Sequence, residues 1–316
     1  MKKTLWLFCL KRLASLPIIL LGVSLLTFFL MRIVPIEPAE VILRLSGVTP
    51  TTESIRSLEK EMGLNLPLFE QYWLWLKDVL SLQFGTSFVS KLPVAEELLN
   101  KFPATALLAI SSFFLALTIS VPSGIIGALY PYSFINKFVQ MLSIISVSLP
   151  TFWLGFMLIY IFSVQLNLLP TNGTGSLIHL ILPTCTLAIP IIGLFTQTIQ
   201  TSMTRELTKP YIDYAYQRGI SKKVIIFKHV LKHTLTPLLS LFGLTLGNLM
   251  AGAIVVEQVF SWPGVGRYLI ESIINRDYPV IQSYVLIVAV LYVCINLCTD
   301  IIQRLLDPRI KESSYD

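Results

Sequence analysis

The sequence predicts an all-α integral membrane protein with six transmembrane helices. Only 13% of its 316 residues carry a charged side chain, against roughly 25% in soluble domains, and its mean hydropathy is +0.73. A helix needs about 20 apolar residues to span a bilayer. Five intervals contain no Asp, Glu, Lys or Arg and can hold such helices: 13–31, 102–136, 138–204, 233–256 and 278–299.

The interval 138–204 is long enough for two spans. Its middle reads "LNLLPTNGTGS", and Pro, Asn and Gly favour turns. Pro150 is expected to interrupt the first of the two spans, because proline breaks the helical hydrogen-bond ladder. The predicted spans are 13–31, 104–128, 138–163, 178–199, 235–256 and 279–299.

The distribution of basic residues predicts that both termini are cytoplasmic. In this orientation Lys and Arg concentrate at the N-terminus and in a cytoplasmic loop, 200–234, as short cytoplasmic loops require. The external segment 32–101 contains the aromatic-rich stretch "LPLFEQYWLWLKDVL", typical of a helix at the outer membrane interface. This helix either packs on the spans or docks an external partner. The basic net charge is a topology signal, so we expect contact with membrane lipid and no binding to nucleic acid.

No pattern in the sequence predicts catalysis. A Walker phosphate loop requires Gly-Lys, and no Gly is followed by Lys, so the chain is expected to be no enzyme and to have no ATPase site. His229 and His233 share a helical face, but lysines surround them and oppose a metal cation. Cys294 and Cys298 are expected to pack in the last span. We therefore predict no metal site and no catalytic residue.

Small residues mark one face of the fifth span, and such residues let membrane helices approach closely. The partner is either another span of this chain or a second subunit. Asn248 in the same span either lines a polar pathway or makes an interhelical hydrogen bond. The predicted helix-packing face consists of Ser240, Gly243, Gly247 and Ala251.

The loop 200–234 is too highly charged to cross the membrane. Pro210 suits the first turn of a helix, with Thr208 a possible cap, and Gly219 suits the position just after its end. Ser221 can cap a second helix running through Lys232. The apolar stripe expected on this second helix consists of Val224, Phe227, Val230 and Leu231.

Within this loop "DYAYQRG", Asp213 to Gly219, resembles the Glu-Ala-Ala-x-x-x-Gly coupling loop of ABC-importer permeases, with Asp213 in place of Glu and Tyr214 in place of the first Ala. Further motifs along nearly the whole chain are similar, in order, to the dipeptide/oligopeptide/nickel permease family, first-permease type. These motifs are "FGTSF" (84–88), "SLPTFWLG" (148–155), "LPTNG" (169–173), "EQVFSWPGVGRY" (257–268), "RDYPVIQ" (276–282) and "LDPRI" (306–310).

The resemblance implies one permease domain over 1–316 with a type I ABC-importer permease fold in a bacterial inner membrane. It implies a second homologous permease, two ATP-binding subunits and an external solute-binding protein. ATP and Mg²⁺ would be bound by the ATPases, and this chain would hold no cofactor. The implied ATPase-coupling residues are Tyr211, Asp213, Ala215, Arg218, Gly219 and Ser221. The candidate pathway residues are Pro150, Asn248 and Glu257, the last of which could instead pair with Arg267.

The expected cargo is nickel or a nickel, cobalt or zinc chelate bound to a metallophore. The run "VILRLSGVTPT" (41–51) resembles nickel and metal-chelate importers more than peptide ones. The alternative is import of di- or oligopeptides by the same machinery. An alternative of another class is a secondary transporter that works alone, which would be expected to carry ionisable groups within its spans.

Overall fold

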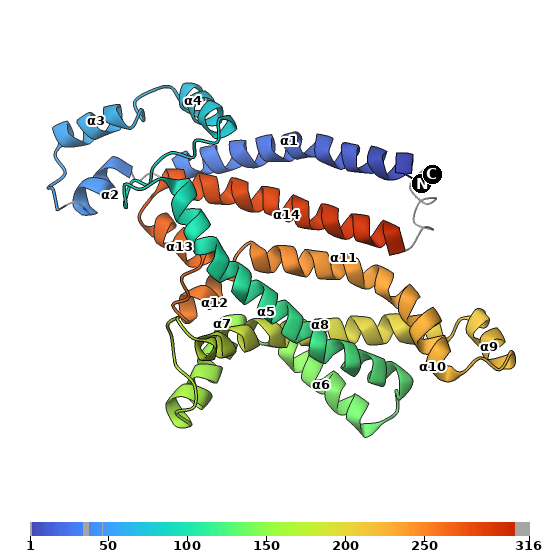
Figure 1. Cartoon of the computed structure of the whole chain (residues 1–316). Coiled ribbons are helices and arrows are strands. Elements are labelled where there is room, and N and C mark those ends of the chain that lie inside the picture. Colours follow the sequence, from blue (N-terminus) through green and yellow to red (C-terminus); the bar gives the residue numbers. More distant parts are fainter. Residues whose placement is uncertain (1, 34–37, 46, 307–316) are drawn as a thin grey trace. The chain divides into compact units, whose positions relative to one another are not determined.

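The computed structural model describes residues 2–33, 38–45 and 47–306, and in this part of the chain the regular structure is helical (Figure 1). Most of the "LDPRI" motif lies outside the described residues. The helices are α1 (Lys2–Ile33), α2 (Pro38–Leu45), α3 (Thr52–Glu61), α4 (Leu68–Leu80), α5 (Val94–Leu129), α6 (Phe134–Ser148), α7 (Thr151–Leu158), α8 (Leu177–Leu207), α9 (Pro210–Gln217), α10 (Lys222–Val224), α11 (Leu231–Met250), α12 (Ile254–Val259), α13 (Val265–Ile274) and α14 (Tyr278–Leu306), with π-helical segments η1 (Ile159–Gln165) and η2 (Ile225–Val230).

Five helical segments of the described chain are long and apolar enough to cross a membrane: Ala14–Ile33, Val94–Leu129, Leu177–Leu207, Leu238–Val259 and Tyr278–Leu305. Each contains most of one predicted span. The helix α8 continues past residue 199, the predicted end of the span, and ends at Leu207. A bent helix pair would make a sixth span.

That pair lies where the third span was predicted, and it is sharply bent. The segments Phe134–Ser148 and Thr151–Gln165 meet at 108°, so the span is interrupted where Pro150 was expected to break it. The break is at Leu149 and Pro150, both in extended conformation. The residue before a proline is pushed out of the helical region, and proline has no N–H to donate. Pro150 thereby becomes the N-cap of α7.

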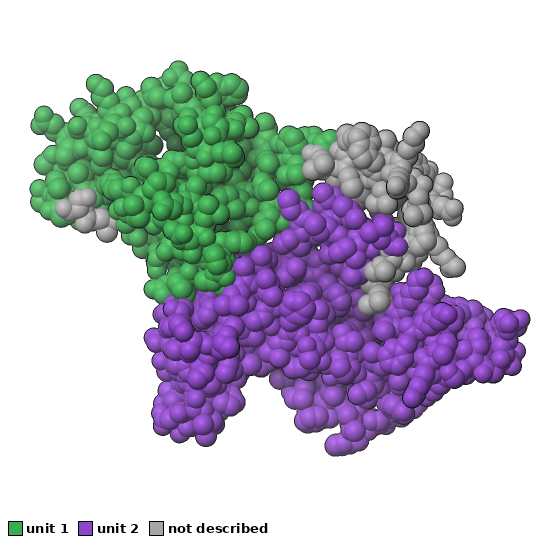
Figure 2. All heavy atoms as spheres, in the orientation of Figure 1, with its two compact units in different colours: residues 1–105, 263–293 green, residues 106–262, 294–316 purple. Residues whose placement is uncertain are grey.

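The chain forms two compact units, which Figure 2 colours separately. Unit 1 comprises residues 1–105 and 263–293, and unit 2 comprises 106–262 and 294–316. Both α5 and α14 contribute to each unit. The single permease domain predicted for 1–316 stays a prediction.

In unit 1, α4 packs on α1 through the aromatic stretch noted in the sequence. The hydroxyls of Tyr72 and Ser24 share a hydrogen bond of 2.9 Å, and the Tyr72 ring lies edge-on to Phe28 at 5.2 Å. Arg32 Nε donates to Gln71 Oε1 at 2.9 Å. Trp73 on the same helix is exposed. The packing interpretation of this stretch therefore holds for one face of α4.

A buried carboxylate joins the two sequence stretches of unit 1. Asp277 is 1% exposed and accepts hydrogen bonds from Ser87 Oγ at 2.5 Å and from the backbone N–H of Phe88 at 3.0 Å. Nearby, the Tyr268 hydroxyl donates to Glu97 Oε2 at 2.5 Å. Burial, with this hydrogen bond second, raises the pKa of Tyr268, so its hydroxyl keeps its proton.

In unit 2 the predicted small-residue face packs against another part of this chain. Gly243 on α11 lies directly against Thr299 on α14, where a Cβ would clash, and Ser240 Oγ donates to Gln303 Oε1 at 3.0 Å. Gly247 is buried and Ala251 half-buried at the end of α11. Similarly, Gly193 on α8 allows close approach of Ser143 and Ser146 on α6.

Replacing Asp277 with alanine is expected to destabilise unit 1. The substitution leaves a buried hydroxyl and a backbone N–H without their acceptor, at a cost of about 2–4 kcal/mol. The measurement is the midpoint of thermal unfolding of the purified chain in detergent. The control is Asp78→Ala, which removes an exposed carboxylate from α4. An equal midpoint for both variants would contradict the anchoring role of Asp277.

Candidate functional site

The loop 200–234 contains the predicted first short helix, α9, and the glycine that follows it. The second helix is not short, because α10, η2 and α11 follow one another without a break from Lys222 to Met250. Pro210 occupies the first position of α9, with Lys209 as its N-cap. Gly219 follows α9 at φ +75, a left-handed conformation that glycine adopts without strain. Ser221 is the N-cap of α10, although its side chain makes no capping hydrogen bond. The cap predicted at Thr208 is wrong for α9: Thr208 ends α8, and its hydroxyl donates to the Arg205 carbonyl at 3.0 Å.

The inner face of α9 is fixed to the ends of two long helices. Ile212 and Ala215 are buried in an apolar cluster with Ala128 of α5 and Met203 of α8. Ile225, Ile226 and Val230 of η2 complete the cluster. The loop is therefore a packed extension of unit 2.

Half of the apolar stripe predicted for the second helix is wrong. Val230 is buried and Leu231 half-buried, but Val224 and Phe227 are 43% and 64% exposed. The buried positions beside Val230 are Ile225 and Ile226. The cause is the π-helical turn of η2. Its hydrogen bonds join residues five apart, which places Ile225 and Val230 on the same face.

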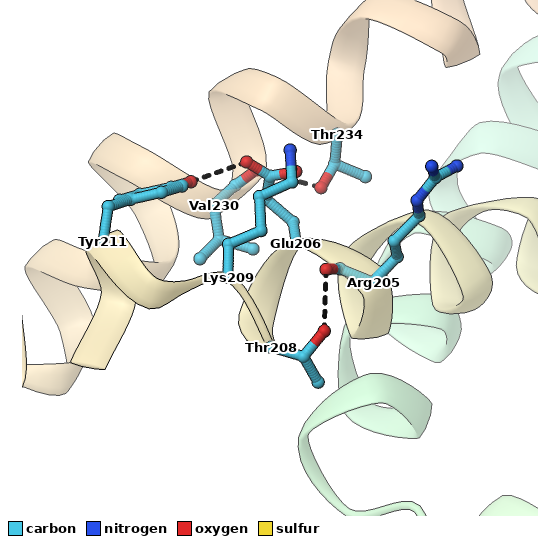
Figure 3. A network of polar contacts seen from close by, with 7 residues as sticks. All are labelled: Arg205, Glu206, Thr208, Lys209, Tyr211, Val230 and Thr234. Carbon is cyan, nitrogen blue, oxygen red and sulfur yellow. Dashed lines mark hydrogen bonds and ion pairs between the residues drawn. The ribbon is translucent and has the colours of Figure 1, made fainter.

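A buried carboxylate, Glu206, ties α9 to α8. It is 7% exposed; Lys209 Nζ lies 2.6 Å from its Oε2, and the Tyr211 hydroxyl donates to its Oε1 at 2.6 Å (Figure 3). The Tyr211 ring also lies edge-on to His233 of α11 at 6.0 Å. We call Glu206, Lys209 and Tyr211 the Glu206 network. It fixes the direction in which the chain leaves α8.

Glu206 was not singled out from the sequence. It lies in a basic stretch, where a lone carboxylate is usually solvated. The available signal was its position four residues before Pro210, with Lys209 between them, which places an acidic group beside the first turn of the next helix.

The outer face of α9 is open. Asp213 and Arg218 are exposed, and Tyr214 and Tyr216 are 61% and 43% exposed. The Arg218 guanidinium lies over the Tyr214 ring at 5.8 Å. Of the predicted coupling residues, Ala215 thus lies on the inner face, Tyr211 in the Glu206 network, and Asp213 and Arg218 on the outer face.

The predicted pathway residues lie in different surroundings. Pro150 and Asn248 are exposed, whereas Glu257 on α12 is 0% exposed. Arg267 donates to Glu271 at 2.9 Å. Glu257 is thus enclosed by other parts of this chain, and the pathway role predicted for it stays a prediction. Among the described residues, no three His, Cys, Asp or Glu side chains gather as metal ligands would.

Comparison with protein families matches nearly the whole chain. Residues 120–312 match the family described as binding-protein-dependent transport system inner membrane component. Residues 5–109 match the N-terminal family of the same transport-system membrane components.

Individual relatives and solved structures agree with this result. The chain is 36% identical to a dipeptide transport system permease protein of Alkalihalophilus pseudofirmus, over 96% of this chain and 99% of the relative. It is 34% identical to a glutathione transport system permease protein of Escherichia coli K12, over 96% and 98%. An inward-facing structure of the MetNI methionine ABC transporter shares its fold, with a TM-score of 0.56 at 18% identity, over 66% of this chain and 96% of the other.

These matches are consistent with the helical fold and the packed loop described above. The chain belongs to the family of binding-protein-dependent transport system inner membrane components: it is a multi-pass inner-membrane permease subunit of an ABC importer, with a type I permease fold, and acts with a partner permease, an ATPase and a binding protein.

Proposed function

We propose that this chain forms half of the translocation pore of an importer of di- or oligopeptides. The main support is its similarity, over 96% of its length, to permeases named for dipeptide and glutathione transport. The other half of the pore is a second homologous permease. Two ATP-binding subunits, which hold ATP and Mg²⁺, and an external solute-binding protein complete the complex, and this chain binds no cofactor.

The relatives favour the peptide alternative over the predicted nickel cargo. None of the relatives reported above is named for nickel or a metal chelate. The sequence run that suggested nickel, 41–51, lies in the external segment and contributes no cluster of metal ligands among the described residues. Membership in a binding-protein-dependent family also argues against the alternative of a secondary transporter that works alone.

In the proposed mechanism the loop 200–234 is cytoplasmic, as are both termini, and transmits movement from an ATPase to the pore. The exposed Asp213, Tyr214 and Arg218 on α9 provide charge and aromatic surface for the ATPase. The buried Ile212 and Ala215 and the Glu206 network connect the same helix to α8. A movement of α9 therefore displaces the ends of the long helices, and no reactive group is needed.

Uptake measurements in a strain lacking this gene test the cargo. We expect loss of uptake of a labelled dipeptide and unchanged uptake of radioactive nickel, with recovery on re-expression. The control is re-expression of the Lys137→Gln variant, which changes one exposed cation outside the coupling loop. Loss of nickel uptake with normal dipeptide uptake would reverse the assignment.

Replacing Glu206 with alanine is expected to loosen α9 from α8. Losing a hydrogen bond and an ion pair at a buried carboxylate should speed backbone hydrogen exchange in residues 209–220 by about tenfold. In the reconstituted complex, stimulation of ATPase activity by loaded binding protein should fall in parallel. The measurements are hydrogen exchange by mass spectrometry and the stimulated ATPase rate.

The matched control is Glu271→Ala. It also removes a carboxylate that pairs with a basic residue, but on α13 in unit 1. It should leave exchange in residues 209–220 unchanged. Wild-type exchange and stimulation in the Glu206 variant would refute the mechanical role of the network.

A further inference from the structure

A pocket lined mainly by polar residues opens between α6 and the C-terminal end of α8 in unit 2, and it includes the first residues of the loop 200–234. Its volume is about 540 Å³, within the range of small-molecule sites. Only Ile144 contributes an apolar side chain to its lining. Its polar lining residues are Gln140, Gln197, Gln200, Thr201, Thr204, Arg205 and Thr208.

The pocket-lining residues of α8 repeat at helical spacing, so they share one face of the helix. Thr201, Thr204 and Arg205 are exposed on that face, at the end of a segment apolar enough to span a membrane. Polar and charged groups at such positions lie in water, at the lipid headgroups or against another protein, because lipid tails cannot satisfy their hydrogen bonds. The pocket is therefore accessible to a polar solute.

The pocket carries an uncompensated positive charge. No hydrogen bond or ion pair of the Arg205 guanidinium occurs within the described residues, and its side chain extends away from Glu206, Lys209 and Tyr211 (Figure 3). The adjacent carboxylate, Glu206, is occupied by Lys209 and Tyr211. The groups that line the pocket include no carboxylate. Arg205 is thus free to bind an anionic group that enters.

The neutral groups of the pocket suit amides. A glutamine side chain offers both an acceptor oxygen and N–H donors, and a threonine hydroxyl can act as either. Gln200 already donates to the Gly127 carbonyl at 3.3 Å, whereas Gln140 is exposed. A peptide backbone presents the same donors and acceptors at each residue, and its C-terminal carboxylate matches the planar guanidinium of arginine.

We propose that this pocket is a cargo site, in which Arg205 binds the C-terminal carboxylate of a peptide and the glutamine and threonine side chains bind its backbone amides. The proposal rests on the proposed function and assigns a site to it. A site that binds backbone and terminus while making one apolar contact accepts many side chains. A helix of the second permease is a less suitable occupant, because its backbone amides are already paired and it has no terminal carboxylate to offer Arg205.

The test uses the complete transporter, with both permeases, the ATPases and the binding protein, reconstituted in vesicles. Transport of a labelled dipeptide is compared with that of its C-terminal amide, each supplied with saturating loaded binding protein. The wild type should transport the free acid about tenfold faster, as loss of a charge-assisted hydrogen bond predicts. Arg205→Gln should bring this ratio close to one, and Gln197→Ala should slow both peptides while keeping the ratio.

Two further variants are the controls. Lys137→Gln removes an exposed cation from α6, and Thr198→Val removes a hydroxyl from α8; neither residue lines the pocket. Both should retain the wild-type ratio and rates. Basal ATPase activity and the size of the purified complex establish that each variant is folded and assembled.

The outcomes separate the two proposals. If the wild type transports neither peptide, the proposed function fails, and this site fails with it. If the wild type transports peptides and Arg205→Gln keeps the wild-type ratio, the site alone is refuted. Dissociation of the two permeases in the Arg205 or Gln197 variant would identify the face as a subunit interface and would also refute the cargo site.

Discussion

The buried carboxylate of Glu206 is the interaction on which the proposed coupling depends. It lies in the last turn of α8 and binds Lys209 and Tyr211, the first basic and the first aromatic residue that follow it. Because both contacts are made to one side chain, the direction of α9 is set relative to α8 before any ATPase binds. The buried side chains of Ile212 and Ala215 then pack against the ends of α5 and α8 in one fixed orientation. Without the carboxylate, α9 would be joined to α8 only by a short turn and by non-directional packing.

The sequence predicted the features that depend on charge and on backbone preference. Charge-free intervals located the apolar spans, because a charge inside a bilayer is costly. Pro210 and Gly219 located the start and the end of α9, because each restricts or permits particular backbone angles. The same argument located the interruption at Pro150, although only the structure provides its angle of 108°.

The features that were missed depend on tertiary contacts. A π-helical turn moved the buried face of the second loop helix from Val224 and Phe227 to Ile225 and Ile226, and residue spacing alone assumes an α-helix. Glu206 and Arg205 are adjacent residues of opposite charge, and the sequence does not show where each side chain points. In the structure, Glu206 binds the loop and Arg205 points into a separate pocket. The nickel cargo stays a prediction, and the relatives favour the peptide alternative; the motifs of this family are shared by members with different cargoes.

The contacts of Asp277 also constrain the order in which the protein can form. Ser87 and Asp277 are 190 positions apart in the chain, and the sequence between them includes most of unit 2. Domains generally fold as units while the chain is being synthesised from its N-terminus. Unit 1 cannot do so: its first stretch is made long before its second, and the acceptor for Ser87 and Phe88 is missing until Asp277 has been synthesised. During that interval residues 87–89 must be solvated or held by other factors, and residues 106–262 of unit 2 are synthesised before unit 1 can close.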